Sequence, residues 1–256
     1  MPEPLLTVRD LEAWYGESHI LHGVDLEVRT GEVVTLLGRN GAGKTTTLKS
    51  VMGIVERRRG SVRFGAAELI RLPSNLIARL GLVRSFQISA VFPHLTVLEN
   101  VRLALQRARG HSFDFWRSER VLGELNGRAL ELLDAVGLAQ LAGAIAVELP
   151  YGRKRALEIA TTLAMDPKLM LLDEPTQGMG LEDVDRIRQL IKKVSADRTI
   201  LMVEHNMSVV SSIADTITVL QRGALLAEGP YAEVSRNPQV IEAYMGTAQT
   251  ELAGAH

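Results

Sequence analysis

Cysteine is absent from this 256-residue chain, which excludes disulfide bonds and cysteine-ligated metal sites and is typical of a reducing compartment. Neither sign of charge dominates, because 29 lysines and arginines face 30 aspartates and glutamates, so no overall basic field favours nucleic acid. No apolar run approaches the roughly 18 to 20 residues needed to span a bilayer, and the beginning of the chain lacks the basic and apolar parts of a signal peptide. These absences predict a soluble, cytosolic protein that binds no nucleic acid and reaches a membrane only through a partner.

A glycine-rich segment matches the phosphate-binding pattern G-x-x-x-x-G-K-[ST] at every fixed position. The apolar run at 32–37 before it predicts a buried strand, and residues 45–52 after it predict a helix. Glycines let successive backbone N–H groups point at an anion, and the helix N-terminus adds a partial positive charge. Lys44 would reach the β- and γ-phosphates of a nucleotide, and the Thr45 hydroxyl would ligate Mg²⁺. The predicted nucleotide contacts in this segment are Gly38, Asn40, Gly41, Ala42, Gly43, Lys44, Thr45 and Thr46.

Strand and helix patterns alternate along most of the chain, which predicts an α/β fold with a mainly parallel sheet covered by helices. Early strands are expected at 5–11 and 24–28, in an N-terminal antiparallel β portion, and residues 69–80 are weakly helical. Between about 88 and 166 the pattern is helical, and it opens with Thr96 and Glu99 spaced as a capping box. A loop or short excursion is expected at 110–116. We predict one domain over 1–256, with a P-loop NTPase core at 1–87 and 167–256 and an inserted α-helical subdomain at 88–166.

A second motif ends the apolar run at 169–172 with two acidic residues, Asp173 and Glu174. The apolar residues predict a central strand, so Asp173 would emerge at its carboxyl end, where α/β sheets bind ligands. There its carboxylate would hold Mg²⁺ through water. Glu174 is the predicted general base that polarises a water for attack on the γ-phosphate, a role that typically contributes about 10²- to 10⁴-fold. Together with the glycine-rich segment, this pair predicts a nucleotide-hydrolysing site.

These ordered segments resemble the ATP-binding subunits of ABC transporters over nearly the whole chain. The resemblance implies that Tyr15 stacks on adenine, that Gln87 senses Mg²⁺ and the transmembrane partner, and that His205 is the switch histidine. It also assigns dimer contacts to the loop at 178–181. The residues implied as catalytic are Lys44, Gln87, Glu174 and His205, those implied as metal ligands are Thr45, Gln87 and Asp173, and the implied cofactors are ATP and Mg²⁺.

One segment departs from the family pattern: the usual Leu-Ser-Gly-Gly-Gln is replaced by Leu149-Pro150-Tyr151-Gly152-Arg153. In the family this segment opens a helix toward the γ-phosphate of ATP held by a second subunit. Tyr151, Gly152 and Arg153 are therefore predicted to contact nucleotide in trans. Because Pro150 lacks the serine hydroxyl and Tyr151 replaces the first glycine, we expect a working but weaker closing element.

The Tyr-Gly core of that segment and the stretches 92–100 and 237–246 resemble ATPases of branched-chain (hydrophobic) amino-acid uptake systems. The resemblance implies an ATP-hydrolysing subunit of an ABC importer, peripheral at the cytoplasmic face of the cell membrane. Its partners would be a second ATP-binding subunit, identical or different, two transmembrane permease subunits and, indirectly, a solute-binding protein. The alternatives are urea or amide uptake, a non-transport ABC ATPase, and a regulatory module that binds ATP without hydrolysing it. Glu174 and His205 favour a hydrolysing subunit over the last of these.

Overall fold

A six-stranded sheet runs through the centre of the protein, in the strand order β10-β9-β3-β8-β7-β6. Strands β9, β3, β8, β7 and β6 are parallel, and only β10 pairs antiparallel, with β9. The computed structural model describes residues 3–85, 91–108 and 119–245. The elements in chain order are β1 (Pro4–Tyr15), β2 (Ser18–Arg29), β3 (Val33–Leu37), α1 (Lys44–Val51), β4 (Arg57–Phe64), β5 (Ala67–Glu68), α2 (Ser74–Arg79), β6 (Leu82–Arg84), α3 (Val97–Ala108), α4 (Glu119–Ala135), η2 (Ala139–Leu141), η3 (Ala146–Glu148), α5 (Tyr151–Ala164), β7 (Leu169–Asp173), α6 (Leu181–Ser195), β8 (Thr199–Val203), α7 (Met207–Ile213), β9 (Thr216–Gln221), β10 (Ala224–Gly229), α8 (Tyr231–Val234) and α9 (Pro238–Met245).

The central strands carry apolar runs because both faces of the sheet are covered. Every residue of β3, β7 and β8 is buried. Successive side chains of a strand point to opposite faces, so Met170 and Leu172 of β7 join one core cluster and Leu169 and Leu171 join the other. The predicted α/β fold with a mainly parallel sheet is confirmed.

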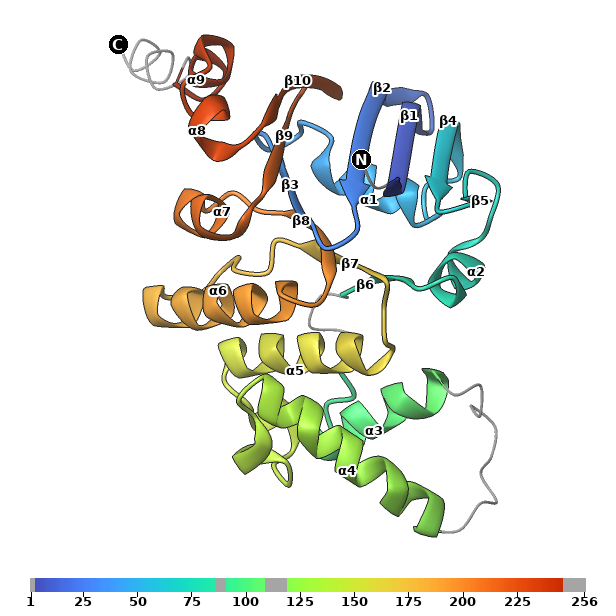
Figure 1. Ribbon diagram of the computed structural model, residues 1–256, viewed down its shortest axis with the longest axis vertical. Coiled ribbons are helices and arrows are strands. Elements are labelled where there is room, and N and C mark those ends of the chain that lie inside the picture. The colour runs from blue at the N-terminus through green and yellow to red at the C-terminus, as the bar shows by residue number, and fades with distance from the viewer. Residues whose placement is uncertain (1–2, 86–90, 109–118, 246–256) are drawn as a thin grey trace.

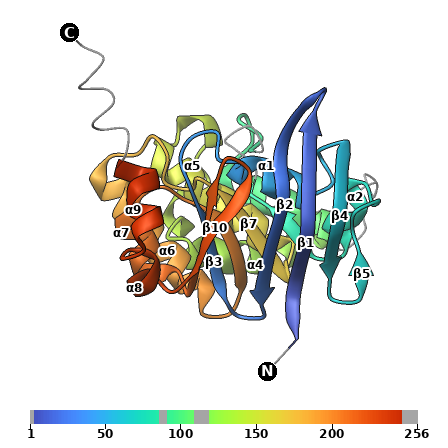
Figure 2. The same ribbon diagram turned by 90° about the horizontal axis from the view of Figure 1, so that it is seen from above.

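A second sheet, antiparallel and in the order β2-β1-β4-β5, lies beside the first. Figure 2 shows β1, β2 and β4 side by side, next to the central strands. Apolar residues of this sheet, of α1 and of one face of the central sheet share a single core cluster. The predicted antiparallel portion is therefore present, and its first two strands are longer than predicted.

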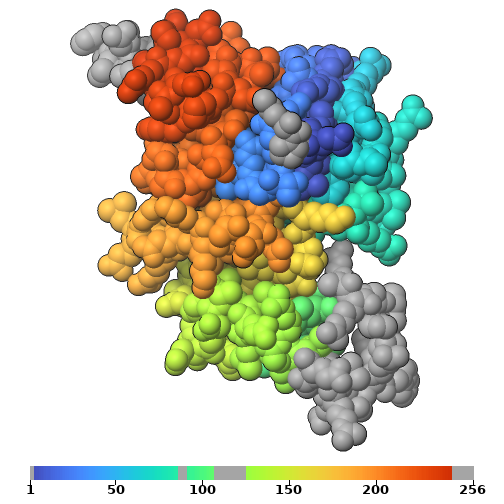
Figure 3. Space-filling view, in the orientation of Figure 1, coloured from blue at the N-terminus to red at the C-terminus, as the bar shows by residue number. Residues whose placement is uncertain are grey.

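Helices α3, α4 and α5 form the other end of the molecule, below the sheets in Figure 1 and yellow-green in Figure 3. The predicted capping box begins α3: the Thr96 backbone N–H donates to the Glu99 carboxylate at 2.8 Å, and the Glu99 N–H donates to the Thr96 hydroxyl at 3.2 Å. Apolar side chains of these helices, of α6 and of the near face of the sheet share one core cluster. The three helices therefore share a hydrophobic core with the central sheet. The loop predicted at 110–116 lies outside the described residues.

None of the helices in the described ranges combines the length and the apolar character needed to cross a membrane.

Candidate nucleotide-binding site

The glycine-rich turn leads from β3 into α1 and has little room for side chains. Gly38 adopts φ +150°, and a Cβ there would lie 2.4 Å from the carbonyl oxygen of Leu220. Gly43, directly before the helix, adopts φ +104°. Glycine alone reaches such conformations without strain. The positive φ angles and the close approach of β9 therefore explain why the pattern has glycine at these positions. The predicted strand, turn and helix are all present.

Lys44 is the first residue of α1, and its side chain is buried within the turn. Its ammonium group donates to the carbonyl oxygens of Gly38 at 2.7 Å and Arg39 at 3.1 Å. Burial lowers the pKa of Lys44, although the carboxylates of Glu174 and Asp173 act in the opposite direction. A buried ammonium held by neutral carbonyls is well placed to bind an anion, because charged acceptors form stronger hydrogen bonds.

Asp173 ends β7 with its carboxylate between two partners. One carboxylate oxygen lies 3.3 Å from the Thr45 hydroxyl, and the other lies 2.6 Å from a guanidinium nitrogen of Arg84. Arg84 ends β6, the strand beside β7. Sequence reasoning missed this residue. Its only signal is a cation at the end of a short apolar strand.

Thr45 and Asp173 offer the oxygen donors that Mg²⁺ prefers. Within the described ranges no group of three histidine, cysteine or acidic residues gathers to hold a metal by itself. Mg²⁺ usually keeps several waters and binds through one or two carboxylates plus substrate phosphates. The donor set therefore fits a metal that arrives with a nucleotide, and does not fit a resident metal centre.

A cavity of about 330 Å³ joins three of the predicted site elements. Tyr15, 47% exposed, comes from the end of β1 and Glu174 from the turn after β7. Glu174 adopts φ +48°, uncommon for a residue other than glycine, and its backbone N–H donates to the Val203 carbonyl at 2.9 Å. The residues that line the cavity are Tyr15, Ile20, Asn40, Gly41, Ala42, Gly43, Lys44, Thr45, Thr46 and Glu174.

His205 follows β8, which pairs with both β3 and β7. Its side chain is 56% exposed, and it does not belong to the cavity lining. The residue before it, Glu204, is fully buried and accepts hydrogen bonds from the Thr176 hydroxyl at 2.6 Å and from the backbone N–H groups of His205 and Asn206 at 2.8 and 3.0 Å. Sequence reasoning missed this role of Glu204. The Glu204 carboxylate thus links the backbone of His205 and Asn206 to Thr176, which lies in the turn that carries Glu174.

The residues predicted to act in trans make contacts with other parts of their own chain. The Tyr151 hydroxyl donates to the Gln177 carbonyl at 3.1 Å, and the Arg153 guanidinium donates to the Gly137 carbonyl at 2.8 Å. Gly152 is buried, and a Cβ there would lie 2.6 Å from Asp183 Cγ. None of the three lines the cavity that contains this chain's own glycine-rich turn. Gln87 lies outside the described residues.

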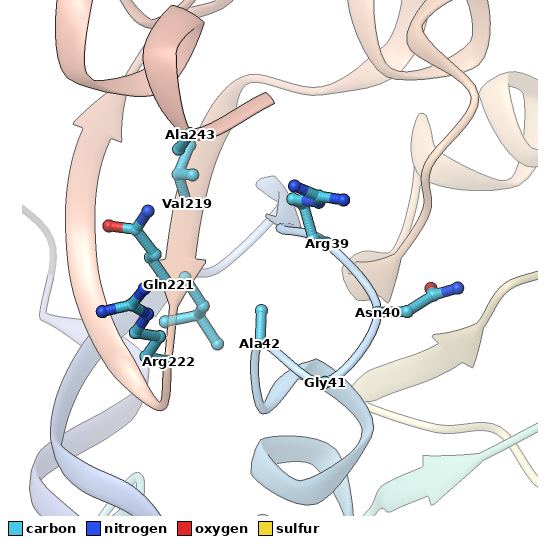
Figure 4. Close-up of a pocket in the computed structure, with 9 residues that line it drawn as sticks. Arg39, Asn40, Gly41, Ala42, Val219, Gln221, Arg222 and Ala243 are labelled. Carbon is cyan, nitrogen blue, oxygen red and sulfur yellow. The ribbon is translucent and has the colours of Figure 1, made fainter. Parts of the chain in front are cut away.

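A second cavity, of about 260 Å³, also borders the glycine-rich turn (Figure 4). Its walls are the turn itself, the hairpin between β9 and β10, and Ala243 of α9. The hairpin is hydrogen-bonded to the turn, because the Gly223 N–H donates to the Ala42 carbonyl at 3.0 Å. The C-terminal elements thus support the backbone that forms the candidate site.

Comparison with known proteins gives concordant matches. The family described as "ABC transporter" matches residues 21–177, and the family described as "Branched-chain amino acid ATP-binding cassette transporter" matches residues 224–249. The chain is 37% identical over 258 residues to the high-affinity branched-chain amino acid transport ATP-binding protein BraF of Pseudomonas aeruginosa, covering 97% of this chain and 100% of BraF.

Two solved structures extend the likeness to the fold. An ATP-binding cassette of an ABC transporter in its ADP conformation superposes with a TM-score of 0.81 at 26% identity, covering 95% of this chain and 99% of that one. A dimeric ATP-binding cassette in a post-hydrolysis state, bound to ADP and Pi, superposes with a TM-score of 0.73 at 26% identity, covering 88% and 98%.

Proposed function

This chain is an ATP-binding, ATP-hydrolysing member of the ABC transporter family, and we propose that it powers the uptake of branched-chain amino acids. The near full-length likeness to BraF supports this substrate class, as does the match of residues 224–249 to a family described by the same cargo. Urea or amide uptake, the first alternative, has no comparable support among these matches.

The cavity that unites Tyr15, the glycine-rich turn and Glu174 carries the catalytic proposal. Tyr15 would stack on adenine, and residues 38–46 would surround the phosphates. The Lys44 ammonium would exchange its carbonyl acceptors in the glycine-rich turn for the β- and γ-phosphates. Glu174 would act as general base toward a water. His205, held by Glu204, would complete the catalytic set with Gln87.

Mg²⁺ would be held by Thr45, Asp173 and Gln87 together with the nucleotide, and would offset charge on the phosphates during transfer. In this chain the carboxyl end of β7 presents Asp173 within reach of Thr45. The two side chains therefore supply oxygen donors from two separate elements.

A second ATP-binding subunit is needed to complete the site. Tyr151, Gly152 and Arg153 do not line their own chain's cavity, and we propose that they cover ATP bound to the partner. A similar ATP-binding cassette is described as dimeric, which supports a second subunit. The partner is either a second copy or a different ATP-binding subunit. The loop at 178–181 would lie between the two.

We propose that the assembly is peripheral at the cytoplasmic face of the cell membrane and docks on two permease subunits. A solute-binding protein would deliver the solute to these subunits. Residues 1–87 and 167–256 would act as the nucleotide-binding core, and 88–166 as the helical subdomain that moves on closure. Binding energy would drive the motion, and hydrolysis would reset it.

Vesicles that contain this chain with its permease subunits and solute-binding protein test the proposal. Uptake of labelled leucine should require ATP and should be lost in Lys44→Met, whereas Lys49→Met, a change on the same helix, should leave it intact. Uptake of urea in place of leucine would transfer the assignment to the first alternative. ATP hydrolysis that drives neither uptake would contradict the importer assignment.

A further inference from the structure

Arg84 and Asp173 form a buried ion pair at the edge of the candidate metal site. The guanidinium and carboxylate are 2.6 Å apart, and their side chains are only 11% and 5% exposed. Asp173 divides its two oxygens between Arg84 and Thr45. One carboxylate thus serves a permanent cation of the chain and is also the proposed acceptor for Mg²⁺.

Within the part of the chain that the structure describes, Asp173 is the ion-pair partner of Arg84. Its Nε is buried and has no hydrogen-bond acceptor among the described residues. Removing a guanidinium from water is costly unless it is paired, so the pairing with Asp173 stabilises Arg84 in its place. The same pairing fixes the rotamer of Asp173 and leaves its other oxygen directed at Thr45.

The charges around the site indicate the consequence for metal binding. Without nucleotide, the ammonium of Lys44 and the guanidinium of Arg84 face the carboxylates of Asp173 and Glu174. A divalent cation that enters alone must share a carboxylate already neutralised by Arg84, close to the cation of Lys44. Nucleotide phosphates add negative charge and remove that obstacle.

We propose that Arg84 is a positioning residue that orients Asp173 and suppresses metal binding until nucleotide is present. Its effect makes Mg²⁺ and ATP bind as a coupled pair. The inference rests on the proposed role of Asp173 at the metal, and it assigns to β6 a part in that site.

Mn²⁺, which has an electron paramagnetic resonance signal when free, is the probe for a test on the full-length chain. Mn²⁺ affinity is measured with and without the non-hydrolysable analogue AMP-PNP in wild type, Arg84→Gln and Arg84→Lys. Arg84→Gln keeps a hydrogen-bond donor but removes the charge, so Mn²⁺ should bind about tenfold more tightly without nucleotide, and the coupling to AMP-PNP should fall by the same factor. Arg84→Lys keeps the charge and should stay close to wild type.

Unchanged Mn²⁺ affinity in folded Arg84→Gln would overturn the inference. If that variant does not fold, wild type and Arg84→Lys provide the test. Tight Mn²⁺ binding to either protein without nucleotide would contradict the claim that the cation at position 84 suppresses metal binding. Asp173→Asn separates this result from the proposed function. If wild type does not bind AMP-PNP, or if Asp173→Asn does not change the affinity for Mn²⁺·AMP-PNP, the proposed site is wrong. If Asp173→Asn changes this affinity and Arg84→Gln does not change Mn²⁺ binding, only the role of Arg84 is wrong.

Discussion

Burial of the Lys44 ammonium has a cost in the nucleotide-free protein that phosphate binding would offset. Its lowered pKa means that the folded state holds this proton less tightly than the unfolded chain. The free energy of unfolding of wild type should therefore rise as pH increases toward the ordinary lysine pKa of about 10.4.

Lys44→Met should remove this rise and leave the nucleotide-free protein at least as stable as wild type at neutral pH. ATP binding should weaken by about 10²-fold, because a desolvated phosphate would lose a charged partner. Denaturant unfolding at several pH values and an ATP titration measure both effects, with Lys49→Met as the control. A Lys44→Met protein that binds ATP normally would contradict the assignment of the turn.

Some residues of the candidate site could be predicted from the sequence, and others could not. The strand, turn and helix around 38–46 and the strand that ends at Asp173 could be predicted because each motif is local and has a fixed spacing. Arg84 beside Asp173 and Thr176 beside Glu204 are pairs of residues distant in sequence that only the strand order brings together. Arg153 shows the same limit, since its bond to Gly137 depends on how the helices pack.

At the scale of elements, the hairpin between β9 and β10 supports the glycine-rich turn. Gly223 adopts φ +79°, and a Cβ there would lie 1.9 Å from the Ile20 carbonyl oxygen. Its N–H donates to Ala42, and its carbonyl accepts from the His22 N–H at 2.8 Å. The hairpin therefore connects β2 to the turn that would hold the phosphates.

Gly223→Ala should displace this hairpin, lower the free energy of unfolding by more than about 3 kcal/mol, and weaken ATP binding. Gly31→Ala is the matched control, because Gly31 has nearly the same φ, +80°, with nothing within 4 Å of its Cβ position. It should cost only the backbone strain, about 1 kcal/mol. Equal losses in the two variants, measured by urea unfolding, would show that the close approach to β2 contributes nothing.

The elements themselves were predictable to different degrees. The apolar runs of β3, β7 and β8 predict buried strands because both faces of the sheet are covered. Strands β1 and β2 extend beyond the predicted 5–11 and 24–28, since their far ends form a hairpin with polar outward side chains such as His19 and His22. The helix expected over 69–80 is limited to Ser74–Arg79 and begins after Pro73.

At the scale of the whole molecule, each chain would supply two separate half-sites. The unusual segment at 149–153 begins α5, where Pro150 occupies the N-cap position without a side-chain hydrogen bond. A serine there would cap the helix, contributing about 1 kcal/mol, and would also restore the family's hydroxyl. Asparagine caps equally well but has no hydroxyl.

Pro150→Ser should strengthen ATP-dependent self-association in a Glu174→Gln background by about thirtyfold, since each of the two composite sites of the dimer gains one hydrogen bond to phosphate and each bond contributes about 1 kcal/mol. Pro150→Asn separates capping from phosphate contact, because it should raise thermal stability to a similar extent without this gain. Sedimentation velocity with and without ATP measures the association. Identical dimerisation of the serine and asparagine variants would eliminate the hydroxyl argument.

ATP binding and turnover of Glu174→Gln test the central claim most directly, namely that the cavity between Tyr15, the glycine-rich turn and Glu174 hydrolyses ATP. The account predicts ATP affinity close to that of wild type and turnover reduced by about 10²-fold or more, because the variant keeps the cavity and loses the base. Near-normal turnover in this variant would contradict the claim.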